Sequence, residues 1–410
     1  MTKTILHVDI NSYFATVLQQ ENPHLRGKPI GVIKAEGRTC LIAVSKEAKL
    51  RGIQTGSRLH EVMKLCPEIV AVPASFERYL DATQRLKKVF TQISPDVFIY
   101  SLDEAFIDIT DCQKYLYPTI LTAAEKVQAL IKAELGEWIT CNVGISHNRL
   151  LSKMASEIAP KGGVLRIDDT NKDAILAEVS FKDVCGVGYR LEKKLAALGI
   201  QHPYEIRLAD PDELRRVFGP FWSQELLKIA YGEESHLLHQ VDHPPEHMKS
   251  VSRSITGYHL YDDEAAIKRI LYNLIEEVTY KVRRMELAGR YVWLSVSDHD
   301  RSWSAHRTLS HHIRHTSELF EVAYQQLYLG WQRQFKVIRF AVGLGLLSRE
   351  RQVPRPLFGR QDKLDKVARA MDSISNDYGL FTLRSGLLLN QEVIRPEVTG
   401  FLGDRQYYGL

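Results

Sequence analysis

The chain has 410 residues, of which 44% are hydrophobic and 25% charged, and its formal net charge is +4. This composition is typical of a globular protein, and the length predicts two to four domains. The sequence has no apolar run of about 18 residues and no apolar leader at its start, so we expect neither a membrane span nor a signal peptide. Its five cysteines form no CxxC pair, which favours free thiols in a reducing cytoplasm.

The first predicted element is a buried strand at residues 4–10, followed by a helix at 12–20. Asp9 lies in this strand beside Leu6 and Val8. Buried strands rarely carry an acid unless the acid is paired or binds a metal ion. Asp9 is therefore a candidate metal ligand.

Residues 28–167 alternate short apolar runs with helical patterns. A hairpin near residues 101–104 carries Asp103 and Glu104 between two apolar runs, and exposed turn residues are the alternative interpretation of this pair. Three carboxylates on neighbouring strands would suit Mg²⁺, and two such ions about 3.5–4 Å apart recur in polymerases and nucleases. The β/α order predicts an α+β domain with a smaller insertion. The expected strands are 29–33, 40–44, 138–144 and 164–167, and the expected helices are 45–51, 57–65, 76–93 and 119–135.

The sequence pattern of residues 168–235 predicts several short helices. A GxG loop at Gly186 and Gly188 separates two of them. Backbone N–H groups in such a loop can bind a phosphate, and a plain helix–helix turn is the alternative.

The remaining chain begins with a linker at 236–248, which contains Pro244 and Pro245 and should be stiff. The patterns beyond it predict a β-α-β-β-α-β order, typical of a ferredoxin-like domain. A tail with one helix near 361–375 follows. The predicted strands are 250–259, 290–297, 301–309 and 336–344, and the predicted helices are 263–285 and 316–330.

Basic residues are concentrated in this second part. Residues 249–360 carry a net charge of +7, whereas 1–248 carry −2 and 361–410 carry −1. A local basic excess is expected of a DNA-binding module, with chance asymmetry of a solvated surface as the alternative. Arg253 and Arg307, on strands rich in serine, are the candidate phosphate contacts, and an ordinary half-exposed sheet face would explain them equally well.

Two strings carry a family resemblance: LHVDINSYF at residues 6–14 and YSLDEAFID at residues 100–108. Both resemble the motifs of the Y-family DNA polymerases, the translesion class. The resemblance implies an α+β right-hand polymerase with a palm, small fingers, a helical thumb with a helix–hairpin–helix, and a ferredoxin-like little finger. It implies a palm at 1–18 and 73–167, fingers at 19–72, a thumb at 168–235, a linker at 236–248, a little finger at 249–348 and a tail at 349–410.

The resemblance also implies roles for single residues. Asp9, Asp103, Glu104 and the Ile10 carbonyl would bind two Mg²⁺ ions. Phe14 would be a steric gate against ribonucleotides, with Tyr13 beside it. Where the family has a tyrosine and an arginine near the triphosphate, this chain has Lys46 and Lys49, and the family's Lys-Pro-x-Gly lysine is displaced to Lys161. Gly186 and Gly188 correspond to the thumb hairpin that grips DNA.

The implied partners are primer–template DNA and deoxynucleoside triphosphates, bound by a monomeric, cytoplasmic, low-fidelity translesion polymerase. We also expect a sliding clamp to bind a peptide containing Gln352, Leu357 and Phe358, although two extra residues separate Gln352 from Leu357 relative to the family pattern. The alternative is a catalytically silent, DNA-binding accessory subunit, which the intact Asp9, Asp103 and Glu104 disfavour. A nucleotide cyclase is a second alternative, but it would have no use for the GxG loop and the basic module.

Overall fold

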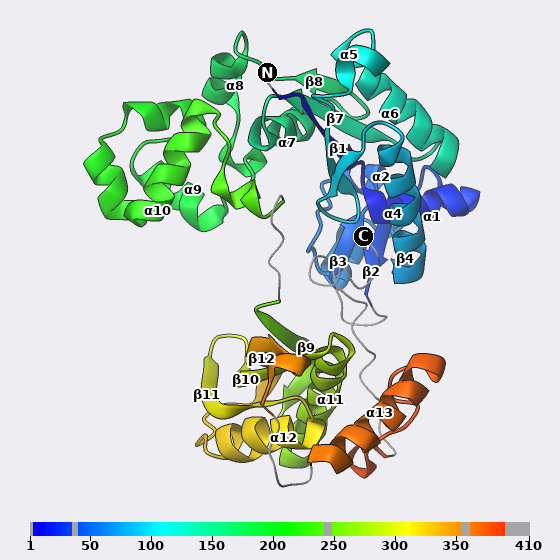
Figure 1. Ribbon diagram of the computed structural model, residues 1–410, viewed down its shortest axis with the longest axis vertical. Coiled ribbons are helices and arrows are strands. Elements are labelled where there is room, and N and C mark those ends of the chain that lie inside the picture. Colours follow the sequence, from blue (N-terminus) through cyan, green and yellow to red (C-terminus); the bar gives the residue numbers. More distant parts are fainter. Residues whose placement is uncertain (1–2, 35–39, 242–247, 355–360, 390–410) are drawn as a thin grey trace. The chain divides into compact units, whose positions relative to one another are not determined.

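The computed structural model describes residues 3–34, 40–241, 248–354 and 361–389. The described residues form two compact units, one on each side of the segment 242–247. Two sheets and a group of short helices make up the amino-terminal unit, and one sheet with its helices makes up the carboxy-terminal unit (Figure 1).

A five-stranded sheet forms the centre of the amino-terminal unit. Its strands are β1 (Ile5–Ile10), β5 (Asp96–Ile99), β6 (Glu104–Asp108), β7 (Cys141–Ser146) and β8 (Val164–Arg166). The order is β5-β6-β1-β7-β8, and β1 is antiparallel to both of its neighbours. The two motifs noted in the sequence therefore lie on adjacent strands, and the expected hairpin before Glu104 is confirmed.

One face of this sheet is buried beneath two long helices. These are α4 (Phe76–Thr91) and α6 (Ile120–Leu135), both close to the predicted bounds. Leu6 and Val8 of β1 are fully buried in the core that the sheet forms with them. Because side chains alternate along a strand, Asp9 points to the opposite face.

The opposite face is covered in part by helix α7 (Arg149–Ile158). The helix backbone lies directly on strand β7, since a Cβ atom added to Gly144 would be 1.9 Å from the Ser152 carbonyl oxygen. Any side chain at this position would push the helix off the sheet. The contact brings polar residues of α7 close to the acidic ends of β1 and β6.

A smaller sheet follows β1 and helix α1 (Tyr13–Glu21) in the chain. Its order is β3-β2-β4, and it includes one strand that the sequence did not predict. That strand, β4, has only four residues and ends in Pro73, yet it pairs in parallel with β2. The elements are β2 (Ile30–Ile33), β3 (Leu41–Val44), α2 (Lys46–Lys49), α3 (Leu59–Leu65) and β4 (Val70–Pro73).

Residues 168–235 are helical, as predicted, and a 3-10 helix, His236–Val241, occupies the start of the segment that was expected to be an extended linker. The α-helices are α8 (Lys172–Glu178), α9 (Tyr189–Ala197) and α10 (Pro211–Tyr231), with 3-10 turns between them. The helix α10 is interrupted at Gly219, which has a non-helical φ of 77° and is followed by Pro220. Leu176, Leu195 and Leu226 share a core with α7, so this helical group packs on the side of the large sheet that carries Asp9.

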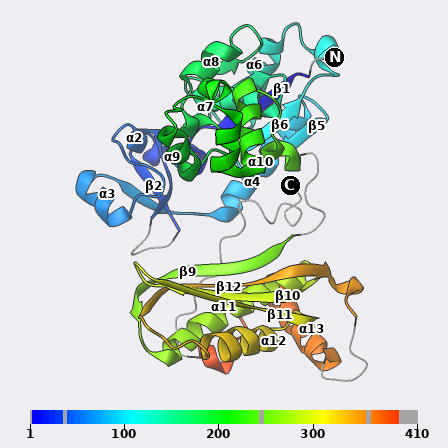
Figure 2. The same cartoon turned by 90° about the vertical axis from the view of Figure 1, so that its left-hand side faces the viewer.

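The carboxy-terminal unit has the predicted β-α-β-β-α-β order of elements. They are β9 (Ser250–Tyr261), α11 (Glu264–Arg284), β10 (Leu287–Ser297), β11 (Ser302–Ile313), α12 (Thr316–Phe320) and β12 (Val337–Arg349). The sheet order is β11-β10-β12-β9, so the crossover through α11 joins two strands that have β12 between them. The helices lie on one face of the sheet (Figure 2). The expected helix at 316–330 continues beyond α12 as a π-helical segment, Glu321–Tyr328.

Helix α13 (Gln361–Tyr378) packs on the carboxy-terminal unit. Arg283 of α11 forms a bidentate ion pair with Asp372 of α13, with N–O distances of 2.8 and 2.7 Å. Beyond the helix, Phe381 and Leu388 are buried. The described residues of the expected tail therefore belong to the packed structure of this unit.

Candidate active site

Three acidic residues meet where β1 ends and β6 begins. Asp9 lies directly opposite Glu104 in the antiparallel pair, and the Ile10 N–H donates a 3.0 Å hydrogen bond to the carbonyl oxygen of Asp103. Opposed residues of an antiparallel pair project to the same face. The side chains of Asp9 and Glu104 therefore share the face on which α7 packs.

Burial and mutual repulsion raise the pKa of two of these carboxyl groups. Burial, followed by the charges of Glu104 and Asp103, raises the pKa of Asp9 to about 8. Burial also raises the pKa of Asp103, against an opposing hydrogen bond from the Ser101 hydroxyl. Both shifts show that added negative charge is unfavourable here, so a bound cation would stabilise the ionised cluster.

Glu104 shows the opposite shift. Burial favours its neutral form, but a hydrogen bond from His7 and the positive charge of Lys153 outweigh this effect and lower the pKa of Glu104 to about 2. His7 Nε2 lies 3.1 Å from Glu104 Oε2, and the Lys153 ammonium contacts the same oxygen. His7 Nδ1 is held in turn by Ser156 Oγ at 2.6 Å.

Three residues of α7 that belong to or adjoin this network were not among the predicted site residues. Lys153, Ser156 and Glu157 are spaced by three and four residues, which places them on one side of the helix. Lys153 and Ser156 are buried, whereas a helix covering a sheet normally buries apolar residues there. A lysine at a core position of an amphipathic helix was therefore the signal available in the sequence.

The donor set fits divalent cations of the Mg²⁺ type, which prefer carboxylate and carbonyl oxygens. Within the described ranges, no three acidic, His or Cys side chains converge closely enough to hold an ion as they stand. This is consistent with the position of Glu104, whose Oε2 contacts Lys153 and His7. Asp9 and Asp103, with raised pKa values, are the groups that would gain most from a cation.

The aromatic pair Tyr13 and Phe14 opens helix α1 directly after the acidic strand. Phe14 is 7% exposed and stacks on Tyr79 of α4 with ring centroids 4.2 Å apart. The Tyr13 hydroxyl donates a 2.6 Å hydrogen bond to the Tyr79 carbonyl oxygen. Between strand and helix, Ser12 adopts a left-handed backbone with φ 51°, which turns the chain sharply from Asp9 toward Phe14.

Of the three predicted triphosphate lysines, Lys49 lies close enough to the acids for the charges of Asp9 and Asp103 to act on it, and Lys161 acts on Lys49. Lys49 ends α2 and Lys161 lies in the turn after α7, and both are exposed. Burial of part of its side chain, followed by the charge of Lys161, lowers the pKa of Lys49, while Asp9 acts in the opposite direction. Lys46 begins α2 and is also exposed. Lys49 and Lys161, from two separate elements, are thus close enough to influence each other, and Lys49 is influenced by the acids as well.

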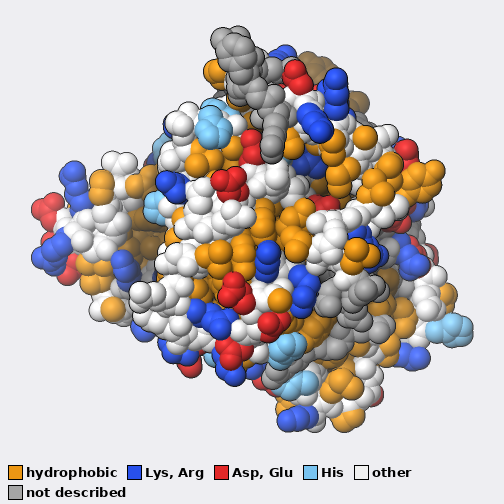
Figure 3. Space-filling view, turned by 90° about the horizontal axis from the view of Figure 1, so that it is seen from below, with side chains coloured by type: hydrophobic (Ala, Val, Ile, Leu, Met, Phe, Trp, Pro, Cys, Tyr) orange, Lys and Arg blue, Asp and Glu red, His pale blue; other side chains and the backbone are white. Residues whose placement is uncertain are grey.

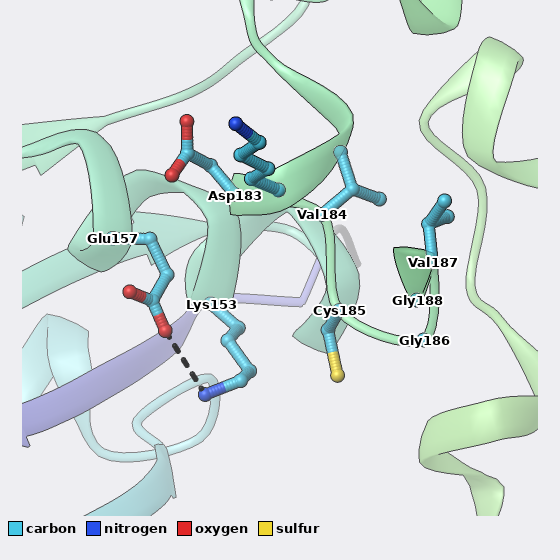
Figure 4. A pocket seen from close by; sticks show the side chains of 9 residues that line it. Lys153, Glu157, Asp183, Val184, Cys185, Gly186, Val187 and Gly188 are labelled. Carbon is cyan, nitrogen blue, oxygen red and sulfur yellow. Dashed lines mark hydrogen bonds and ion pairs between the residues drawn. The ribbon is translucent and has the colours of Figure 1, made fainter. Parts of the chain in front are cut away.

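The GxG loop lines a cavity of about 460 Å³ between α7 and α9. Gly186 has φ +90°, and Gly188 is the residue before the first turn of α9, where an added Cβ would meet open space. Figure 4 shows Lys153 and Glu157 on one wall and the loop on the other. Exposed backbone N–H groups at a helix start can bind a phosphate.

The structure contradicts the predicted phosphate contact of Arg253. Its side chain is 4% exposed and forms a 2.7 Å ion pair with Glu277 of α11, which is 1% exposed. Arg253 lies between Val251 and Ile255 on the helix-covered face of β9, because residues two apart in a strand share a face. It therefore stabilises the interior of the unit.

Arg307 is exposed, but it also lies on the helix side of its strand. Its guanidinium donates a 2.6 Å hydrogen bond to Gln326 of the π-helical segment. Other basic residues of the segment 249–360 are likewise in ion pairs, among them Arg283 with Asp372 and Arg301 with Asp298. On the face drawn in Figure 3, basic side chains are interspersed with acidic ones. The net charge of +7 therefore overstates the basic surface available to DNA.

The predicted clamp-binding peptide is only partly described. Gln352 is exposed in a short 3-10 turn, Glu350–Gln352. Leu357 and Phe358 lie outside the described residues.

No helix in the described ranges is long and apolar enough to cross a membrane. Residues 8–157 match the model of the impB/mucB/samB family, and residues 248–357 match that of its C-terminal domain. Together with the acidic site on the sheet, these matches show that the chain belongs to the impB/mucB/samB family, the Y-family of DNA polymerases.

Individual relatives are similar in sequence to this chain along nearly its whole length. DNA polymerase IV of Pelotomaculum thermopropionicum is 31% identical over 388 residues, which cover 92% of each protein. DNA polymerase IV 1 of Bacillus subtilis is 26% identical and covers 98% of this chain and 97% of the relative. The solved structure of a Y-family DNA polymerase chimera, 23% identical, has a TM-score of 0.71 and covers 84% of this chain and 98% of the chimera. The predicted right-hand fold is thereby confirmed.

Proposed function

We propose that Asp9, Asp103 and Glu104 hold two Mg²⁺ ions with which this DNA-directed DNA polymerase carries out low-fidelity translesion synthesis. The observation that carries the proposal is that Asp9 and Glu104 share one sheet face and that Asp103, next to Glu104 in the chain, is close enough for its charge to act on Asp9, whose pKa is raised to about 8. When bound, the ions would lower the pKa of the primer 3′-hydroxyl and neutralise the departing pyrophosphate. The Ile10 carbonyl, at the end of β1, is the proposed further ligand.

The other residues of the site would position the substrates. Lys49 and Lys161, with Lys46 at the start of the same helix, would bind the triphosphate as separate point charges. Phe14 would lie beneath the deoxyribose and exclude a 2′-hydroxyl, with Tyr13 held beside it by its hydrogen bond to the backbone of Tyr79.

Contacts to primer–template DNA would come from two places. The loop at Gly186 and Gly188 would bind the primer backbone through its N–H groups. In the carboxy-terminal unit, the sheet face opposite the helices carries small hydroxyl side chains that suit phosphate contacts, which are Ser250, Ser252, Ser254, Thr256, Ser295, Ser297, Ser302 and Ser304. Because Arg253 is buried, we propose that DNA phosphates contact this face and not Arg253.

Primer extension by the isolated chain tests the function. With Mg²⁺ and deoxynucleoside triphosphates, we expect synthesis on an undamaged template and continued synthesis past an abasic site. DNA binding without any extension would instead support the catalytically silent accessory subunit.

We also propose that the enzyme is a cytoplasmic monomer recruited by a sliding clamp through Gln352, Leu357 and Phe358. Two prolines in this segment, Pro354 and Pro356, would keep it extended and reduce the entropy lost on docking. Changing Leu357 and Phe358 together to Ala should abolish clamp-stimulated synthesis and leave extension on short primers intact. Persistent stimulation would show that the clamp binds another surface.

A further inference from the structure

Lys153 of α7 connects the acidic cluster with the cavity at the GxG loop. Its side chain is 9% exposed, and its ammonium contacts Glu104 Oε2 and lies 3.5 Å from Glu157 Oε1. The ring of Tyr100 lies 5.3 Å from the same nitrogen. A buried ammonium thus neutralises the carboxylate that is proposed to bind a cation.

The same side chain lines the 460 Å³ cavity. Glu157 lies next to it on the wall formed by α7, and the opposite wall is the segment from Lys182 to Gly188 (Figure 4). The first turn of α9 begins directly after Gly188. A phosphate at that helix start would lie across the cavity from Lys153.

We propose that Lys153 is a positioning residue that exchanges partners: it holds Glu104 before a divalent cation binds, and afterwards it contacts a primer backbone phosphate in the cavity. This inference rests on the proposed two-cation function, because it requires a cation to take over the charge of Glu104. It assigns to one lysine the coupling between the metal site and DNA binding.

Electrostatics gives the reason for the exchange. A divalent cation at Glu104 would repel the ammonium, which at present contacts the same oxygen. Lysine has a flexible four-carbon stem, so its nitrogen can move several ångströms without any change in the helix. In the cavity the ammonium would keep Glu157 as a neighbour and gain a phosphate as its new anionic partner.

Binding of Mn²⁺ to the metal-free protein tests the first half. Electron paramagnetic resonance of free Mn²⁺ should show about tenfold tighter binding by Lys153→Met, because the competing charge is gone. Lys153→Gln, which keeps a hydrogen-bond donor for Glu104, is a second neutral variant with the same expected direction. Lys153→Arg keeps the charge, and Lys182→Met removes a charge from the same cavity away from Glu104, so both should bind Mn²⁺ like the parent.

Thermal unfolding identifies the variants that remain folded. Unchanged or weaker Mn²⁺ binding by a folded neutral variant would overturn the inference. A parent protein that neither binds Mn²⁺ nor extends primers would instead overturn the proposed function itself.

Primer–template binding tests the second half. Fluorescence anisotropy without nucleotides measures how much Mn²⁺ strengthens DNA binding, and coupling of this kind is reciprocal between the two ligands. We expect the gain to be about three- to tenfold smaller in Lys153→Met than in the parent, as for the loss of one charge-assisted contact. Lys153→Arg, which keeps the positive charge, should keep the parental gain. Equal gains in the parent and Lys153→Met would show that Lys153 does not reach the DNA.

Discussion

Asp9 and Glu104 face each other across the antiparallel strands β1 and β6, and only Glu104 of the two is held by His7 and Lys153. The pairing fixes both side chains on the same face of the sheet, since a slip of one residue would turn either of them into the core. The two carboxylates therefore differ: a hydrogen bond and a positive charge stabilise the ionised Glu104, whereas Asp9 has no such partner among the described residues and would gain most from the proposed cation.

Removal of Asp103 should abolish Mg²⁺-dependent primer extension. We expect Asp103→Ala to lower the rate at least about a thousandfold, because the cluster loses one of its three proposed carboxylate ligands. DNA affinity should stay within about twofold of the parent. Asp96→Asn, an exposed residue of the neighbouring strand β5, is the matched control and should extend normally. Extension by Asp103→Ala near the parental rate would disprove the metal site.

Truncation of Phe14 should relax the choice of sugar. Phe14→Ala should incorporate ribonucleotides far more readily, measured as the ratio of ribonucleotide to deoxynucleotide insertion. Phe90→Leu shortens another buried aromatic residue, on α4, and should leave that ratio unchanged. If Phe14→Ala keeps the parental ratio and loses about 3–5 kcal/mol of stability, Phe14 is only a core residue stacked on Tyr79.

Glu276 should make the stability of the carboxy-terminal unit depend on pH. It is 6% exposed, its Oε2 has no hydrogen-bond partner among the described residues, and burial raises its pKa to about 7 against the charge of Arg283. The folded state therefore holds a proton between pH 4.5 and 7 that the unfolded state has released. The free energy of unfolding falls as pH rises through this window.

Urea unfolding of Glu276→Gln at pH 5 and pH 8 checks this sign. The parent should lose roughly 2 kcal/mol more than the variant between the two values. The neighbouring Glu277→Gln is the contrasting control, because it leaves the buried Arg253 without its carboxylate. It should destabilise the protein by about 3–5 kcal/mol at both pH values. Parallel pH profiles for the parent and Glu276→Gln would contradict the raised pKa.

Helix α13 should contribute to the stability of the carboxy-terminal unit. Asp372→Asn weakens the bidentate pair with Arg283 and should lower the free energy of unfolding by about 1–3 kcal/mol. Asp377→Asn changes an exposed acid on the same helix and should have little effect. Equal stability of the two variants would mean that the pair between Arg283 and Asp372 does not stabilise the packing of α13.

The sequence predicted the acids of the site because an aspartate inside an apolar run is unusual, and two such runs identify a shared site. It also predicted the order of elements in the carboxy-terminal unit, where periodicity is strong. It did not predict the partner of Arg253, since Glu277 meets it only after α11 has packed on the sheet. The sequence nevertheless contained a signal, because Arg253 is two residues from both Val251 and Ile255 and so shares their inward face. Lys153 was not predicted because its partner, Glu104, begins β6, a strand that is distant in the sequence.

The contact between Gly144 and the backbone of α7 makes the proposed active site sensitive to a substitution at Gly144. Replacing that hydrogen by a methyl group would displace Ser152 and Ser156 together, and with them the supports of Glu104 on both sides. A residue that touches no substrate would thus disable the site as thoroughly as a lost carboxylate. Lys46 and Lys49, the proposed triphosphate contacts, are exposed on a separate element, so substitutions there would leave α7 in place.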